Sequence, residues 1–181
     1  MKYDGFSGIE LKTFAQTLQT EHYDSIEQLC ADIKKQAKKI NGLEQSETST
    51  QYVSKCEKIV SDIENHVSGR KGIYIPYVDK LSDKVKDNHD CTNCSGTCRV
   101  NHDMHIMELH ATNESMKKVL SRLQMISLPL YSETMFPDEY RRLRSNMTLL
   151  ETSIAELFFL ENNYLIPKIA DAQKSINAGG K

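Results

Sequence analysis

The stretch LFFLENNYLIP, residues 157–167, places a glutamate, Glu161, on the apolar face of a predicted helix. A related stretch, HVSGRKGIYIP, occurs 91 positions earlier, at residues 66–76, and carries Arg70 where the later copy has Glu161. Both copies end in an Ile-Pro pair at the same distance from these residues. Two equivalent helices that present matched inward groups are typical of a four-helix bundle with a central site. The two copies therefore predict a cation opposite an anion at the centre of such a bundle.

Helical periodicity extends outward from these two copies over most of the chain. Apolar residues recur at steps of three and four, which is the spacing of one helix face. The predicted inward positions fall into four segments: Leu11, Ala15, Leu18, His22, Ile26, Leu29, Ile33, Ala37 and Ile40; Cys56, Ile59, Ile63, His66, Arg70, Ile73, Tyr77 and Leu81; Ile106, Leu109, Met116, Leu120 and Leu123; and Leu143, Met147, Leu150, Ile154, Leu157, Glu161 and Leu165. We predict an all-α protein with one domain over residues 1–181, an antiparallel up-down-up-down four-helix bundle.

Breaks in this periodicity predict the connections between the helices. Non-helical segments are expected at residues 43–50, 87–98 and 129–136, which are polar or irregular. The second helix contains two glycines and a proline, Gly69, Gly72 and Pro76. Because proline lacks a backbone donor and its ring clashes with the preceding turn, we expect this helix to bend or break.

Composition and charge exclude several classes of protein. Of the 181 residues, 39% are hydrophobic and 27% are charged, and the net charge is −2. No basic excess indicates nucleic-acid binding, no apolar run indicates a membrane span, and no signal peptide is recognisable. We therefore expect a cytoplasmic protein that binds neither nucleic acid nor membrane. The sequence shows no nucleophile–base pair and no phosphate-binding loop, so it assigns no catalytic residue and leaves enzymatic activity open.

Four polar side chains fall on otherwise apolar helix faces. His22 lies in the middle of the first stripe, His66 and Arg70 lie on the second, and Glu161 lies on the fourth. A lone core histidine is commonly a neutral ring satisfied by one hydrogen bond. Buried carboxylates and guanidinium groups are rare unless they are paired or bind a ligand. Their convergence predicts a polar site inside the bundle.

At these positions the chain resembles the hemerythrin-like family, whose domains carry a His-x3-Glu-Glu-x2-Leu-Phe-Pro motif on helices two and four and single histidines on helices one and three. The copy at residues 157–167 is most similar to the fourth helix of the repair-of-iron-centres branch. Those di-iron proteins respond to nitrosative and oxidative damage to iron–sulfur clusters. The resemblance implies a non-haem di-iron centre, with His22, His66 and His110 as histidine ligands and Glu161 as one bridging carboxylate.

Two positions depart from the family pattern. Arg70 stands where the other bridging carboxylate belongs, and Leu157 stands where the helix-four histidine belongs. Two iron ions about 3.5–4 Å apart need bridging carboxylates, and a guanidinium that keeps its proton repels them. We therefore expect no ordinary di-iron centre. Two arrangements remain open. In the first, which we favour, Arg70 pairs with Glu161, and the ion pair forms a metal-free polar core with His22 and His66. In the second, His22, His66 and Glu161 form a mononuclear metal site, and Arg70 is turned away.

A cysteine-rich loop between the second and third helices is a separate candidate metal site. The segment over residues 87–102 supplies three thiols and two imidazoles: Cys91, Cys94, Cys98, His89 and His102. Four of these five groups can bind one metal ion, which predicts zinc, with iron in an iron–sulfur cluster as the rival. The alternative is a set of surface thiols that are prone to oxidation.

Two functions from different classes fit this pattern. The first is a degenerate hemerythrin-like protein that senses iron, oxygen or nitric oxide in a stress response and keeps its metal in the cysteine-rich loop. Its ligand would be a small diatomic molecule. The second is a non-enzymatic interaction module. In that case the bundle is a metal-free scaffold, and a structural zinc knuckle shapes a surface for a protein partner or for a second copy of the chain.

Overall fold

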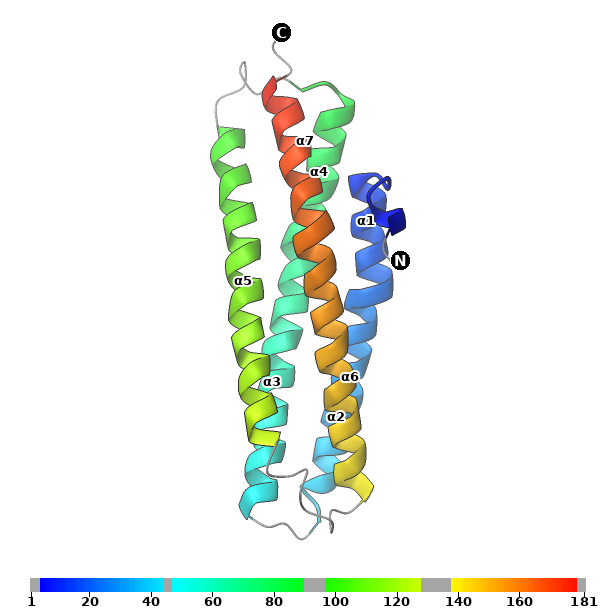
Figure 1. Cartoon of the computed structure of the whole chain (residues 1–181), viewed down its shortest axis with the longest axis vertical. Coiled ribbons are helices and arrows are strands. Elements are labelled where there is room, and N and C mark those ends of the chain that lie inside the picture. Colours follow the sequence, from blue (N-terminus) through cyan, green and yellow to red (C-terminus); the bar gives the residue numbers. More distant parts are fainter. Residues whose placement is uncertain (1–3, 44–46, 90–96, 128–137, 179–181) are drawn as a thin grey trace.

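The protein is an all-α bundle of four long helical rods. Its computed structural model describes residues 4–43, 47–89, 97–127 and 138–178, and within these ranges it contains no strand. The rods alternate in direction along the chain and pack against one another (Figure 1). The predicted antiparallel four-helix bundle is therefore confirmed. No described helix combines the length and the apolar composition that a bilayer-spanning segment needs.

Three of the rods consist of two α-helices joined by a short π-helical segment. After a 3-10 turn, η1 (Asp4–Phe6), the first rod contains α1 (Leu11–Thr17), η2 (Leu18–Tyr23) and α2 (Asp24–Ile40). The second contains α3 (Glu47–Gly69), η3 (Arg70–Tyr74) and α4 (Ile75–Lys86). The third is the single helix α5 (Thr97–Ser127), and the fourth contains α6 (Asp138–Leu160), η5 (Glu161–Leu165) and α7 (Ile166–Ala178).

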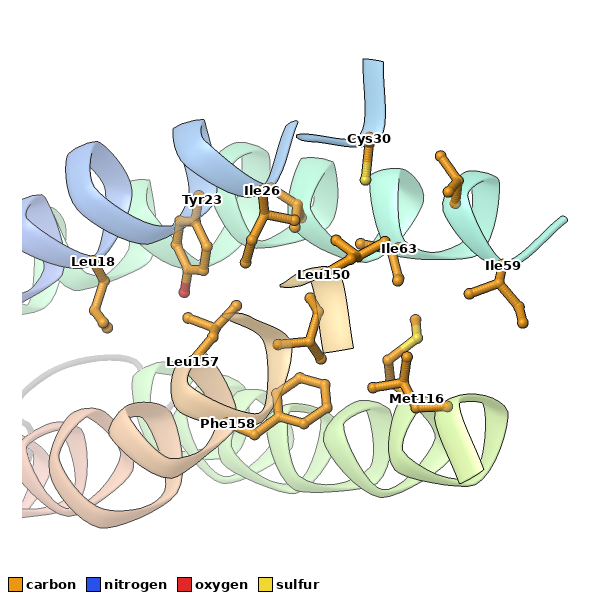
Figure 2. Packing of buried hydrophobic residues seen from close by; sticks show 14 of the residues in the cluster. Leu18, Tyr23, Ile26, Cys30, Ile59, Ile63, Met116, Leu150, Leu157 and Phe158 are labelled. Atoms are coloured by element: carbon orange, nitrogen blue, oxygen red, sulfur yellow. The ribbon is translucent and has the colours of Figure 1, made fainter. Parts of the chain in front are cut away.

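The core lies along the common axis of the rods. In one half of the bundle α2 packs on α3 and α6, and in the other half α4 packs on α1 and α7, while α5 contacts both α3 and α7. Side chains from all four rods interdigitate in this core (Figure 2). Most of the predicted inward positions are buried, among them Leu18, Ile26, Ile33, Ile63, Leu81, Leu109, Leu143, Leu150, Ile154, Leu157 and Leu165.

The second rod differs most from its prediction. Gly69, Gly72 and Pro76 do not end the helical rod, because η3 carries the chain from α3 into α4 without a gap. The extra residue in this wider turn rotates the side chains that come after it about the helix axis. Ile73, which is predicted to face inward, is 51% exposed, and Tyr74 is buried in its place.

The predicted connections agree with the structure only in part. Helix α3 already begins at Glu47, so the predicted loop over residues 43–50 is too long. Thr97 and Cys98, which are expected in a loop, form the first turn of α5. The predicted connection at residues 129–136 lies outside the described residues.

Candidate functional site

The three π-helical segments bring three residues together at one level of the bundle. They are Tyr23 at the end of η2, Arg70 at the start of η3 and Glu161 at the start of η5. Each segment closes with a backbone hydrogen bond to the carbonyl five residues earlier: Asp24 to Gln19, Ile75 to Arg70, and Ile166 to Glu161. In η3 and η5 the next residue is a proline, Pro76 or Pro167. A proline ring would clash with the carbonyl four residues earlier in an α-helix, so the wider turn accommodates it. Such π turns occur frequently at functional sites.

Arg70 and Glu161 form an ion pair in the middle of the bundle. The Arg70 Nε donates to Glu161 Oε1 at 3.1 Å, and the two side chains are only 2% and 0% exposed. The guanidinium also donates through Nη2 to α5, at 2.7 Å to Asn113 Oδ1, 2.9 Å to Thr112 Oγ1 and 3.3 Å to the Leu109 carbonyl oxygen. A buried charge pair persists only when its remaining hydrogen bonds are satisfied, and α5 supplies the acceptors that Arg70 requires.

Two tyrosines and a second amide complete this site. The Tyr23 hydroxyl donates to Glu161 Oε1 at 2.7 Å, and the centre of the Tyr74 ring lies 4.8 Å from the guanidinium carbon of Arg70. Asn113 in turn donates from Nδ2 to Asn162 Oδ1 at 3.3 Å. We name this set the central polar cluster; its members are Tyr23, Arg70, Tyr74, Thr112, Asn113, Glu161 and Asn162, and they come from all four rods.

Electrostatics in the central polar cluster keep Tyr23 protonated. Burial of its ring is the largest cause that raises the Tyr23 pKa well above the ordinary value, and the charge of Glu161 and the hydrogen bond to it raise this pKa further. The hydroxyl therefore keeps its proton and donates a hydrogen bond to the carboxylate. Glu161 Oε1 accepts from both Tyr23 and Arg70, whereas Oε2 is enclosed and has no hydrogen-bond partner among the described residues.

His66 is a neutral imidazole beside the central polar cluster. Its ring is half-buried and contacts the ring of Phe158 edge to face, with centroids 5.4 Å apart. Burial first, and then the charge of Arg70, lower the His66 pKa to about 3. Nε2 is enclosed and makes no hydrogen bond to any described residue. This histidine lies close to where the sequence places it, but no two other described His, Cys, Asp or Glu side chains join it to form a metal site.

The two other bundle histidines that are predicted as ligands do not join this site. His22 is half-buried, and its neighbour Tyr23 occupies the inward position, because η2 contains one more residue than an α-helical turn. Figure 2 shows Tyr23 pointing from the first rod toward Leu157. His110 is exposed on α5. The structure therefore places Tyr23, and not His22, in the central polar cluster, and the reason is the change in helical register.

A di-iron centre does not fit these residues. The Arg70 guanidinium fills the place of one bridging carboxylate, and the Oε1 of Glu161 is already engaged by Tyr23 and Arg70. Leu157 is fully buried and offers no ligand atom. In the parts of the chain that the structure describes, no three His, Cys, Asp or Glu side chains converge to hold a metal ion. The mononuclear alternative, with His22, His66 and Glu161, therefore finds no support in this geometry.

The cysteine-rich loop remains a prediction. Cys91 and Cys94 lie outside the described residues, as do the side chains of Cys98 and His102, whose backbones belong to α5. His89 ends the described part of the second rod, and its enclosed Nε2 has no partner among described atoms.

The remaining two thiols belong to the hydrophobic core. Cys30 and Cys56 are buried and free. Burial is the main cause that raises the pKa of each thiol to about 12. A thiol with such a pKa is neutral and unreactive at physiological pH, so these two cysteines serve packing.

Sequence reasoning missed most of the hydrogen-bonding partners of the ion pair. Asn113 could have been found, because it falls four residues after Leu109 and three before Met116, both of which are assigned to the inward face of the third helix. Tyr23 could not, because its inward position depends on the π turn in η2.

In comparisons with known proteins, no family model, no curated protein and no solved structure matches this chain. The four-helix architecture is therefore established from the structure itself. The resemblance to hemerythrin-like domains rests on the residues of the two motif copies.

Proposed function

We propose that this protein is a degenerate hemerythrin-like bundle that senses iron, oxygen or nitric oxide through a metal held by its cysteine-rich loop. In this proposal an ion pair has replaced the di-iron centre of the bundle. The observation that carries it is the contact between Arg70 and Glu161, which occupy equivalent positions in two copies of one motif. Both copies begin a π turn at the charged residue and end it before an Ile-Pro pair.

Because an ion pair occupies the centre of the bundle, the proposal places the metal in the cysteine-rich loop and not in the bundle interior. Arg70 and Glu161 are almost fully buried and paired, and the guanidinium beside the carboxylate repels an incoming metal cation, although Glu161 Oε2 has no hydrogen-bond partner among the described residues. Thiolates and imidazoles of the cysteine-rich loop are ligands that suit zinc or an iron–sulfur cluster. The bundle then serves as the rigid support, and the loop carries the metal that responds to stress.

Metal content tests the role of the loop. We expect anaerobically purified wild-type protein to be coloured and to contain iron. We expect a variant with Cys91→Ser, Cys94→Ser and Cys98→Ser to be colourless and metal-free, with unchanged helical circular dichroism. Equal iron in both proteins, or no metal in either, would contradict the proposal.

Restoring the two metal ligands that the chain lacks tests whether the bundle has a hemerythrin-like origin. In the triple-serine background, Arg70→Glu with Leu157→His replaces both departures from the hemerythrin-like pattern. We expect this variant to take up iron on anaerobic reconstitution, whereas the triple-serine parent takes up none. A matched control is Arg122→Glu, which makes the same charge change at an exposed position of α5. A folded variant without iron would count against a hemerythrin-like origin.

A second candidate function is an interaction module with a structural zinc knuckle. It is favoured by two large apolar side chains on α5, Met107 and Met125, each 72% exposed. Methionines are common at surfaces that bind partners. A colourless protein with one zinc ion per chain and no iron would support this alternative over the sensor.

A further inference from the structure

A cleft of about 500 Å³ lies between α5 and the junction of α6 with η5. This volume is within the range of sites that bind small molecules. Its apolar and partly aromatic surface is formed by Leu120, Ala155, Phe158 and Phe159. The polar side chains of Lys117, Ser121 and Glu151 line it as well. The residues that line the cleft are not among those of the cysteine-rich loop, so a ligand proposed for it does not rest on the proposed sensing function.

Two asparagines give the end of the cleft a defined hydrogen-bonding pattern. Asn162 accepts through Oδ1 from Asn113, which fixes its amide and leaves the Nδ2 hydrogens without an acceptor among the described residues. Asn163 donates from Nδ2 to the Phe159 carbonyl oxygen at 2.8 Å, which leaves its Oδ1 as an acceptor. One donor and one acceptor therefore stand side by side at the same end of an apolar cleft.

The charges around the cleft favour a neutral occupant. Two charged side chains line it, Lys117 and Glu151. The Lys117 ammonium group lies 2.6 Å from the Glu114 carboxylate, and Glu151 is also engaged by another residue. A ligand with a net charge would give up its hydration without gaining a free partner of opposite sign.

We propose that this cleft binds a small neutral molecule with an aromatic or branched apolar body and a carboxamide-like end. The apolar body packs between Phe158 and Leu120, and the amide end donates to Asn163 Oδ1 and accepts from Asn162 Nδ2. The bound molecule would contact two residues that are connected to the bundle centre. Phe158 packs on His66, and Asn162 accepts a hydrogen bond from Asn113 of the central polar cluster.

The probe for a test is 4-fluorobenzamide, followed by fluorine NMR of the full-length protein. For a ligand of this size we expect saturable binding with a Kd of about 1 mM. Two comparison compounds isolate the chemistry: fluorobenzene lacks the amide, and 4-fluorobenzoate replaces it with a charge. Each should bind at least about tenfold more weakly, which is the effect of losing one or two hydrogen bonds.

Blocking the cleft tests the location. Ala155→Trp fills the cleft from an exposed position of α6, and we expect it to abolish binding of 4-fluorobenzamide. The matched control, Ala111→Trp, is at an exposed position of α5 outside the cleft and should bind as wild type does. Should Ala155→Trp fail to fold by circular dichroism, Ser121→Trp fills the cleft from the α5 wall. The proposal is overturned if the folded blocked variant retains binding, if fluorobenzene binds as well as the amide, or if wild type shows no saturable binding.

Discussion

Arg70 is the only described cation in the central polar cluster, and it bonds to residues of two other rods. We expect Arg70→Met to lower the free energy of unfolding by about 3–5 kcal/mol, because it leaves the Glu161 carboxylate buried without its counter-charge. Replacing both partners, as Arg70→Met with Glu161→Leu, should recover most of this loss, since an apolar pair leaves no buried charge. Urea unfolding of the three proteins measures these differences.

An exposed ion pair provides the control for this experiment. Lys117 and Glu114 are 2.6 Å apart on the surface of α5, where solvent screens their charges. Lys117→Met should therefore change the free energy of unfolding far less than Arg70→Met does. If Arg70→Met is no more destabilising than Lys117→Met, the Arg70–Glu161 pair does not hold the centre of the bundle together.

His66 gives the stability of the bundle a specific dependence on pH. Its pKa is about 3 in the folded protein and near 6.5 when unfolded, so between these values the unfolded chain binds more protons. The stability that the neutral ring contributes is therefore complete above about pH 6.5 and is lost progressively as the pH falls toward 3. Because the ring is half-buried, we expect a loss of about 1–3 kcal/mol, less than the full pKa shift implies.

Two phenylalanine variants isolate this effect. His66→Phe keeps the aromatic contact with Phe158 and removes the titrating group, so its stability should fall less than that of wild type between pH 6.5 and pH 4. His110→Phe, at an exposed position, should follow the wild-type pH profile. Parallel profiles for wild type and His66→Phe, measured by urea unfolding at each pH, would exclude a low His66 pKa.

At the scale of the helix, the sequence predicts the elements well, and it misplaces inward side chains mainly at the π turns. Spacings of three and four identify four helical segments because the apolar stripes run for many turns. A π turn adds one residue without changing the composition of the helix. Counting in steps of four from Leu18 therefore reaches His22, whereas the structure buries Tyr23. The Arg70–Glu161 pair can be predicted from the sequence, because both residues stand at the first position of their π turns, before the helical register changes.

The two glycines of the second rod allow a test of the π turn itself. Gly69 ends α3 and Gly72 lies within η3, and a Cβ atom at either position would meet no atom within 4 Å. We expect Gly69→Ala and Gly72→Ala each to stabilise the protein by about 0.5–1 kcal/mol, because alanine loses less backbone entropy in a helix. The reverse change at an exposed helical site, Ala155→Gly, should cost a similar amount and calibrates the measurement.

Thermal unfolding of these variants distinguishes two roles for the glycines. If both alanine variants are stabilised, the π turn results from the proline and the packing around it. A destabilised Gly72→Ala would show that the wide turn requires glycine.

At the scale of the whole molecule, the central polar cluster connects rods that the apolar core also holds together. Arg70 and Tyr74 come from the second rod, Glu161 from the fourth, Tyr23 from the first and Asn113 from the third. A polar network of this kind favours one register of the four rods, because a slip along the axis would leave buried charges unpaired. The sequence predicts the ion pair but not the network, since a partner such as Thr112 has no pattern that separates it from a surface residue.

Because the core and the central polar cluster are complete within the described bundle, the fold should not depend on a metal in the cysteine-rich loop. We expect that removing metal with a chelator and a reductant leaves the helical circular dichroism unchanged. The unfolding midpoint should fall by less than about 4 °C, which corresponds to about 1 kcal/mol for a chain of this length. Small zinc domains behave differently, because in them the metal supplies the folding free energy.

The variant with Cys91→Ser, Cys94→Ser and Cys98→Ser is the control for this experiment. It should unfold at the same temperature as the metal-depleted wild type, and chelator should not affect it. A bundle that loses its helical signal on chelation would show instead that the loop metal is a structural part of the fold.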